Sequence, residues 1–257
     1  MTTTIVLPDA AALAEHAARE VLADAAAAIR ARGYFTFVLS GGNTPRRLYE
    51  KLASEPLVSQ LPWDRTHVFW GDERHVPPDH AESDYRMARE SMLSKVPIPA
   101  ANVHRIEAEL ADAAEAARRY EATIRDTFAA LGQPASATPS FDLVLLGLGA
   151  DGHTASLFPG SPALDEQSRW VASPWVEKFN TYRITLTPPI LNASAHVIFL
   201  ASGTDKADAV WASQHERPEP RRRPSQAIRP SNDRLTWLLD TGAASRLDDR
   251  STPGFSA

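Results

Sequence analysis

The most reactive residue types of this chain gather in short glycine-rich or charged segments, each of which follows an apolar run. His153 lies in one such segment, between Gly152 and Thr154, where a histidine that fills the core would not normally occur. A neutral imidazole can accept a proton from water, and Asp151, two residues earlier, can orient the ring. We predict that His153 is a general base. A short helix is expected after it, whose N-terminal dipole would favour the neutral ring.

A second segment, with the side chains Asp72, Glu73 and Arg74, follows the apolar run that ends at Trp70. An arginine at such a place can stabilise a developing oxyanion or bind a phosphate, and a neighbouring carboxylate can hold the arginine or the base in position. We expect Arg74 to be catalytic and the two acids to contact the substrate. The alternative is an ion pair at the rim of the sheet with no function.

A third segment has the properties of a phosphate-binding loop and consists of Ser40, Gly41, Gly42, Asn43, Thr44 and Pro45. The glycines allow a ligand close to the backbone, and the amides at the start of the next helix point at the same place. Thr44 is expected to be the N-cap and Pro45 the first helical residue. The spacing and lysine of a nucleoside triphosphate loop are missing. A tight turn without a ligand is the alternative.

Gly147, Gly149 and Gly152 match the spacing of a dinucleotide-binding fingerprint, but their surroundings do not. That fold needs a full helix after the glycines and a carboxylate at the end of a second strand. Here Pro159 and Gly160 would end a helix after about two turns, and no carboxylate closes residues 169–173. NAD or FAD is therefore not expected.

Several other chemistries are disfavoured by residues that the chain lacks or disperses. It has no cysteine and no G-x-S-x-G nucleophile motif, which argues against thiolate and covalent acyl chemistry. His75, Asp79 and His80 do not have the spacing of a helix-borne metal site, so no metal is expected. A phosphate-binding loop, a histidine base and cations suit the attack of water on a phosphorylated small molecule.

Alternating apolar and amphipathic segments predict an α/β fold built on a parallel sheet. Strands are expected at residues 3–7, 34–39, 66–70, 141–146, 183–187, 196–200 and 235–240, and helices at 10–32, 45–53, 84–95 (capped by Ser83), 111–131 and 205–214. Because the carboxyl ends of parallel strands meet at one edge, the reactive segments should converge there.

Composition describes an ordinary globular chain of 257 residues, 43% hydrophobic and 23% charged. We expect one domain over residues 1–246 and a frayed tail at 247–257. The net charge of −5 disfavours nucleic acid as a partner. No signal peptide or apolar run of membrane-spanning length is seen, so a cytoplasmic location is expected and no membrane partner. A small molecule is the expected partner; the oligomeric state is open and a monomer is compatible with the sequence.

The chain resembles the 6-phosphogluconolactonases of the glucosamine-6-phosphate isomerase/6-phosphogluconolactonase family. The motifs that carry the resemblance run through most of the chain in order: SGGNTP at 40–45, WGDERHVP at 70–77, GLGADGHTASLFPG at 147–160, RITLTPPILNAS at 183–194, GTDKA at 203–207 and LTWLLDTGAA at 235–244. The histidine motif is the specific one, since SGGxTP is shared with glucosamine-6-phosphate deaminases.

This resemblance implies a Rossmann-like, mostly parallel, doubly wound sheet of the deaminase/isomerase type. It also implies hydrolysis of 6-phospho-D-glucono-1,5-lactone to 6-phosphogluconate in the oxidative pentose phosphate pathway, with no cofactor and no metal. His153 would activate water and Arg74 would help to stabilise the oxyanion. The phosphate would meet residues 40–44, with Arg183 and Lys206 as cationic partners.

One position departs from the family pattern. Where the family usually has S-N-Y-R-M, this chain has Asp84 after Ser83. The arginine-rich segment 215–224 has no family role and is expected to be a solvated loop. Two other functions remain open: an amino-sugar-phosphate deaminase or isomerase, and a sugar-phosphate-binding regulator without catalysis.

Overall fold

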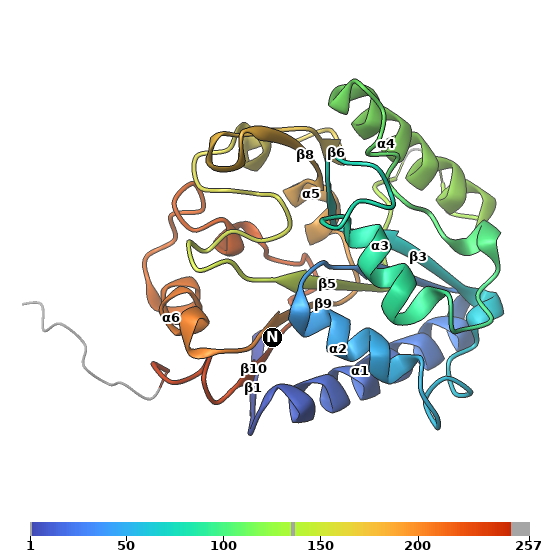
Figure 1. The fold of residues 1–257 in the computed structure, drawn as a ribbon, viewed down its shortest axis with the longest axis horizontal. Coiled ribbons are helices and arrows are strands. Elements are labelled where there is room, and N and C mark those ends of the chain that lie inside the picture. Colours follow the sequence, from blue (N-terminus) through green and yellow to red (C-terminus); the bar gives the residue numbers. More distant parts are fainter. Residues whose placement is uncertain (1, 135–136, 248–257) are drawn as a thin grey trace, which may run out of the picture.

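A six-stranded parallel sheet forms the centre of the computed structural model, which describes residues 2–134 and 137–247. Its strands, in spatial order, are β1 (Thr2–Leu7), β10 (Leu235–Asp240), β9 (Val197–Ala201), β5 (Leu143–Gly147), β2 (Phe35–Leu39) and β3 (Thr66–Trp70) (Figure 1). The continuous apolar runs of β2, β9 and β10 are buried, as in a sheet covered on both faces. The predicted α/β fold is confirmed.

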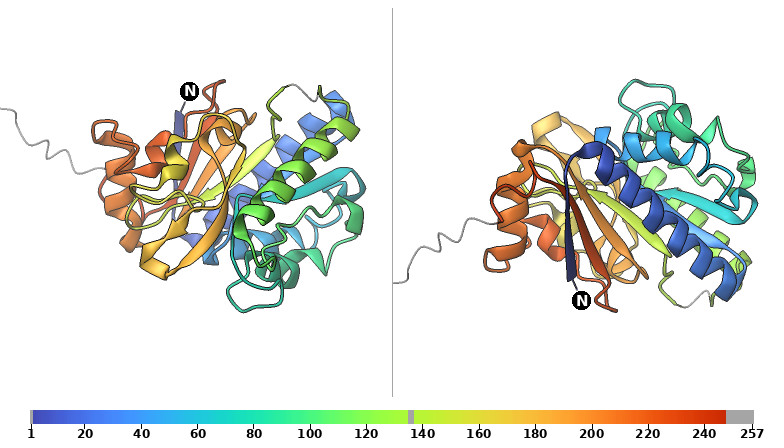
Figure 2. Two further views of the ribbon diagram at one scale, coloured as in Figure 1. Left: turned by 90° about the horizontal axis from the view of Figure 1, so that it is seen from above. Right: turned by 90° about the horizontal axis from the view of Figure 1, so that it is seen from below.

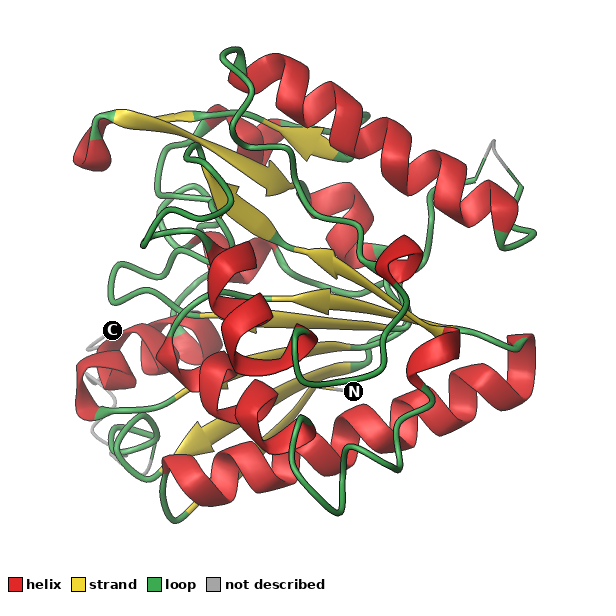
Figure 3. Ribbon diagram, turned by 45° about the vertical axis from the view of Figure 1, so that its right-hand side comes forward, coloured by secondary structure: helices red, strands yellow, loops and turns green. Residues whose placement is uncertain are grey.

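Helices cover both faces of this sheet. On one side α1 (Ala10–Arg32) packs against β2, β10 and α2 (Asn43–Leu52). On the other side α4 (Ala113–Ala130) places Phe128 against Phe69 of β3 and against Phe141. Figure 3 shows α1 and α4 on opposite sides of the sheet. The result is the doubly wound arrangement that the resemblance implied.

The start of α2 differs from the prediction. The helix begins at Asn43, and its N-cap is Gly42, whose φ of 100° is open to glycine but strained for other residues. Thr44 and Pro45 are therefore the second and third helical residues instead of the cap and the first. No side chain caps this helix, so its first amides are left for another acceptor.

A small antiparallel sheet lies beside the main one and was not predicted. It consists of β4 (Asp72–Arg74), β8 (Thr181–Leu186) and β6 (Val171–Ala172), and β7 (Trp175–Val176) pairs with β8. The charged segment after β3 is thus a strand instead of a loop, and the strand expected at 183–187 is β8, outside the parallel sheet. Periodicity identifies a strand but not the direction of its partner.

The remaining helices are short. Ser83 caps α3 (Asp84–Ala88) as predicted, and the chain continues in a π-helical turn over Arg89–Leu93. α5 (Pro188–Asn192) and α6 (Ala207–His215) follow β8 and β9. Figure 2 shows α6 and α4 at opposite ends of the molecule.

The two ends of the described chain meet in the main sheet, where β1 pairs with β10 in parallel from Thr2↔Leu235 to Leu7↔Asp240. Buried apolar residues of both sheets form one cluster. Of the tail predicted at 247–257, residues 248–257 lie outside the described residues. Within residues 2–134 and 137–247, no helix combines the length and the apolar character that a membrane span requires.

Candidate active site

A cavity of about 300 Å³ opens at the carboxyl ends of β2 and β5. The chain places β3 on one side of β2 and β5 on the other, so this is the point where the strand order reverses and where open α/β sheets bind ligands. Its lining unites segments from five places in the sequence: Ser40, Gly41, Gly42, Asp72, Arg74, Asp84, Gly147, Leu148, Gly149, His153, Thr154, Ala155 and Lys206. The predicted convergence of the reactive segments therefore occurs.

His153 and Asp151 form a close pair at this cavity. The Nδ1 atom of His153 lies 2.5 Å from Oδ1 of Asp151, and the His153 amide donates to the same oxygen at 3.2 Å. The hydrogen bond with His153 holds the pKa of Asp151 well below its usual range. An ionised Asp151 accepts a hydrogen bond from the Nδ1–H group of His153. In a neutral ring this leaves Nε2 as the nitrogen that can accept a proton.

Two further residues fix this pair. Phe158 stacks on the His153 ring with a centroid distance of 4.3 Å, and Lys178 Nζ lies 3.4 Å from Oδ2 of Asp151. The short helix expected after His153 is not formed. Residues 154–157 make a turn closed by a bridge between Thr154 and Leu157. The helix-dipole argument for a neutral histidine was therefore wrong. The contact of Asp151 with the ring is the one expected from the sequence.

Two motif glycines provide space for the side chains of this site. A Cβ on Gly149 would lie 2.0 Å from Nδ1 of His153, and a Cβ on Gly41 would lie 2.0 Å from Oδ1 of Asp84. Neither position accepts a larger residue without displacing its neighbour. Within the G-x-G-x-x-G segment it is Gly149 that makes room for the Asp151–His153 pair. No α-helix follows the segment within the described residues 148–187.

The short strand β4 carries the charged residues of the cavity wall. Arg74 has its Nε atom 3.3 Å from Oδ2 of Asp84 and donates from Nη1 to the carbonyl of Glu82 at 2.6 Å. Asp72 accepts a hydrogen bond of 2.6 Å from Oγ of Ser156. Because Ser156 belongs to the His153 segment, this bond ties the histidine loop to β4.

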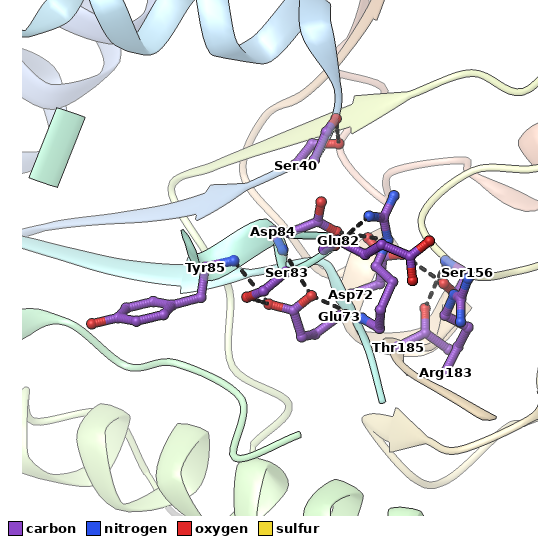
Figure 4. Close-up of polar contacts among 12 residues, drawn as sticks. Ser40, Asp72, Glu73, Glu82, Ser83, Asp84, Tyr85, Ser156, Arg183 and Thr185 are labelled. Atoms are coloured by element: carbon purple, nitrogen blue, oxygen red, sulfur yellow. Dashed lines mark hydrogen bonds and ion pairs between the residues drawn. The ribbon is translucent and has the colours of Figure 1, made fainter. Parts of the chain in front are cut away.

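Among the three charged residues of β4, Glu73 makes contacts that differ from those predicted. Its carboxylate accepts hydrogen bonds from the amides of Arg74, Asp84 and Tyr85 and from the hydroxyl of Ser83. Dashed lines in Figure 4 join it to the start of α3. Burial raises the pKa of Glu73 although these donors oppose the shift. Glu73 does not line the cavity, because its side chain points to the opposite face of β4 from Asp72 and Arg74. Its carboxylate contacts the start of α3, and a contact with substrate stays a prediction.

The α2 end of the cavity has the features expected of an anion site. Ser40, Gly41 and Gly42 line it, and the helix start behind them has no side-chain cap. Tyr49 fixes the loop, since its hydroxyl accepts from the Ser40 amide and donates to the Ser40 carbonyl. Asn43 and Thr44 are not among the lining residues, so of the predicted phosphate-binding loop only Ser40, Gly41 and Gly42 reach the cavity. Lys206 reaches the cavity from the turn after β9.

Arg183 lies elsewhere than predicted. It is opposite Arg74 in the β4–β8 pairing, is buried, and places its guanidinium over the Phe179 ring at 5.1 Å. Burial and the neighbouring Arg74 lower the pKa of Arg183. Since Arg183 is not in the lining, the structure brings it to Arg74 and not to the α2 helix start.

Sequence reasoning missed three contributors to this site. Asp84 was noticed only as a departure from a motif, yet it lines the cavity. Phe158 and Lys178, which contact the histidine pair, have no local sequence signal, because an aromatic stack and a lysine contact arise from tertiary packing. In the described residues, no group of three or more metal-ligating side chains is arranged to hold a metal ion.

A family model described as glucosamine-6-phosphate isomerases/6-phosphogluconolactonase matches residues 8–237. The chain belongs to this family. A 6-phosphogluconolactonase from Nostoc sp. is 41% identical over 246 residues, which cover 95% of this chain and 98% of that protein. One from Synechocystis sp. is 43% identical over 220 residues, covering 86% and 88%.

Solved structures agree with the family assignment. A 6-phosphogluconolactonase from Trypanosoma cruzi superposes with a TM-score of 0.84 at 33% identity, covering 96% of this chain and 97% of that one. The resemblance inferred from the motifs is therefore confirmed for the whole fold. Family membership alone admits both isomerase and lactonase chemistry, so the choice between them rests on the site.

Proposed function

We propose that the chain is a 6-phosphogluconolactonase, which hydrolyses 6-phospho-D-glucono-1,5-lactone to 6-phosphogluconate. The observation that carries the proposal is the Asp151–His153 pair on a cavity that also contains Arg74 and Lys206. The names of the relatives at 41–43% identity support it.

The lactone is an activated ester, and the residues of the cavity supply what its hydrolysis needs. In the proposed reaction a water oxygen attacks C1 while His153 Nε2 takes a proton from that water. The electron pair of the C1 carbonyl bond moves to the carbonyl oxygen. The guanidinium of Arg74 stabilises this oxyanion. The C1–ring oxygen bond then breaks, and His153 returns the proton to the departing ring oxygen.

Binding of the phosphate is assigned to the other end of the cavity. The uncapped start of α2 offers amides and the positive end of the helix dipole, and Lys206 adds a charge-assisted donor. The cavity thus has an anion end and a reaction end, which suits a substrate with a phosphate at C6 and an ester at C1.

The direct test is lactone hydrolysis followed as proton release, because the product acid ionises. The parent protein should exceed the spontaneous rate by several orders of magnitude. Incubation with glucosamine 6-phosphate provides the rival assay, in which a deaminase would release ammonia. Ammonia release without lactone hydrolysis would replace the proposal by the deaminase function, and binding of 6-phosphogluconate without either reaction would indicate a regulator.

A further inference from the structure

Asp84 is a buried carboxyl group of the cavity to which the proposed reaction gives no role. It is the first residue of α3, lines the cavity and is 3% exposed. Its Oδ1 atom lies against Gly41, where a Cβ would come within 2.0 Å. The carboxyl group is therefore at the foot of the 40–42 loop, beside the space that a ligand would fill.

The charged and titratable groups that face Asp84 come from three elements. They are Asp72, Glu73 and Arg74 of β4, Arg183 of β8 and Tyr49 of α2. Among the described residues, Arg74 is the only cation within 4.0 Å of the Asp84 carboxyl group, with Nε at 3.3 Å. Three carboxyl groups thus share two guanidinium groups, and a buried cluster with excess negative charge favours binding of a proton.

The hydrogen bonds indicate where that proton resides. Glu73 receives three amides and a hydroxyl, and Asp72 receives the Ser156 hydroxyl. These donors stabilise the ionised forms. Within the described residues, the ion pair with Arg74 is the only polar contact of the Asp84 carboxyl group at 4.0 Å or less. Burial raises the pKa of Asp84 well above its usual range, and the charge of Asp72 raises it further. This direction agrees with a proton that resides on Asp84.

A sugar phosphate adds about two negative charges to the same cavity. An ionised Asp84 would repel it, whereas a carboxylic acid offers an O–H donor. We propose, on the basis of the proposed lactonase function, that Asp84 binds the substrate as a neutral acid and donates its O–H to a ligand oxygen. Ionisation of Asp84 then weakens binding at alkaline pH.

The first test uses Asp84→Asn, which keeps the shape, remains neutral and offers an N–H donor. Calorimetric titration with 6-phosphogluconate measures Kd from pH 7 to pH 9, where the ligand has a constant charge. In the parent, Kd should rise tenfold or more over this range, and in the variant by less than threefold. Equal rises of Kd in both proteins would overturn the proposal. A tenfold loss of affinity of the variant at pH 7 would also overturn it, because it would mean that the carboxylate is the binding form.

The second test needs neither ligand nor variant activity. Carbon-13 NMR of aspartate-labelled parent protein follows the carboxyl carbons, and the signal absent from Asp84→Asn identifies Asp84. Its midpoint should lie well above the usual range of an aspartate and should fall in Asp72→Asn, where a like charge is removed. A midpoint within or below the usual aspartate range refutes the inference. Failure of the lactonase function would appear separately, as lack of lactone hydrolysis by the parent.

Discussion

His153 and Asp151 lie two residues apart in the chain, and their 2.5 Å contact is the feature on which the proposed chemistry depends. Replacing His153 by Ala should lower turnover of the lactone by about 10²–10⁴-fold, the usual effect of losing a general base. The affinity for 6-phosphogluconate should change less, because the proposal assigns the phosphate to the other end of the cavity. Rates come from proton release corrected for the spontaneous reaction. Activity within threefold of the parent would remove His153 from its assigned role.

Lys206 and Arg183 allow a sharper comparison, since the sequence assigned both to the phosphate and the structure separates them. Lys206→Ala should reduce kcat/KM for the phosphorylated lactone by about 10–100-fold, as expected for one hydrogen bond to a charged group. On glucono-δ-lactone, which has no phosphate, the loss should be under threefold.

Arg183→Ala should instead reduce kcat/KM on both substrates by the same factor, because Arg183 acts beside Arg74. For each variant, the measurement is the loss of kcat/KM on the phosphorylated lactone divided by the loss on glucono-δ-lactone. A phosphate-selective loss for Arg183→Ala would show that the sequence assignment was right and that the cavity rearranges around the ligand.

At the scale of the loops, Gly149 determines where the histidine can lie. Gly149→Ala places a Cβ 2.0 Å from the His153 ring, so the ring must move, and a displacement of about 1 Å is enough to lower turnover by about 10²-fold. Gly71→Ala is the matched control: its Cβ would meet the carbonyl of Leu39 at 3.6 Å, an ordinary contact, and Gly71 does not line the cavity. Similar activity of the two variants would argue against the spatial role of Gly149.

The elements also show how far the sequence could be interpreted. The helix α1 was predicted with its bounds, because Gly33 is a local signal for a helix end, and it ends α1 with a φ of 86°. The structure adds Asp9 as the N-cap. The start of α2 was misplaced by two residues, since Gly42 with a φ of 100° competes with Thr44 as the cap. The strand β4 was missed because three charged residues become a strand only when β8 pairs with them.

The predicted site residues can also be separated into those that line the cavity and those that do not. Seven predicted residues line the cavity, because strand ends in a parallel sheet share one edge: Ser40, Gly41, Gly42, Asp72, Arg74, His153 and Lys206. Asp151 meets His153 through a local turn. Four residues predicted to contact the substrate do not line the cavity: Asn43, Thr44, Glu73 and Arg183. Glu73 and Arg183 both lie in the antiparallel sheet. Which face of such a short strand looks into the cavity depends on a pairing register that the sequence does not display.

For the whole molecule, the shared core of the two sheets supports the proposal that residues 1–246 form one domain. Calorimetry should therefore give a single unfolding transition whose calorimetric and van't Hoff enthalpies agree. For 257 residues, the enthalpy should be about 180 kcal/mol near 60 °C. Two resolved transitions, or a calorimetric enthalpy well above the van't Hoff value, would mean that the small sheet unfolds on its own.

The pairing of β1 with β10 has a consequence for biosynthesis. Residues 2–7 leave the ribosome about 230 residues before their partner at 235–240. At about 5–20 residues per second, roughly 10–50 s separate the two events. During that time the nascent first strand has no neighbour to pair with. Its opening residues, Thr2, Thr3 and Thr4, are polar, and they remain exposed in the folded protein. This polarity suits a segment that must wait unpaired without aggregating until β10 has been synthesised.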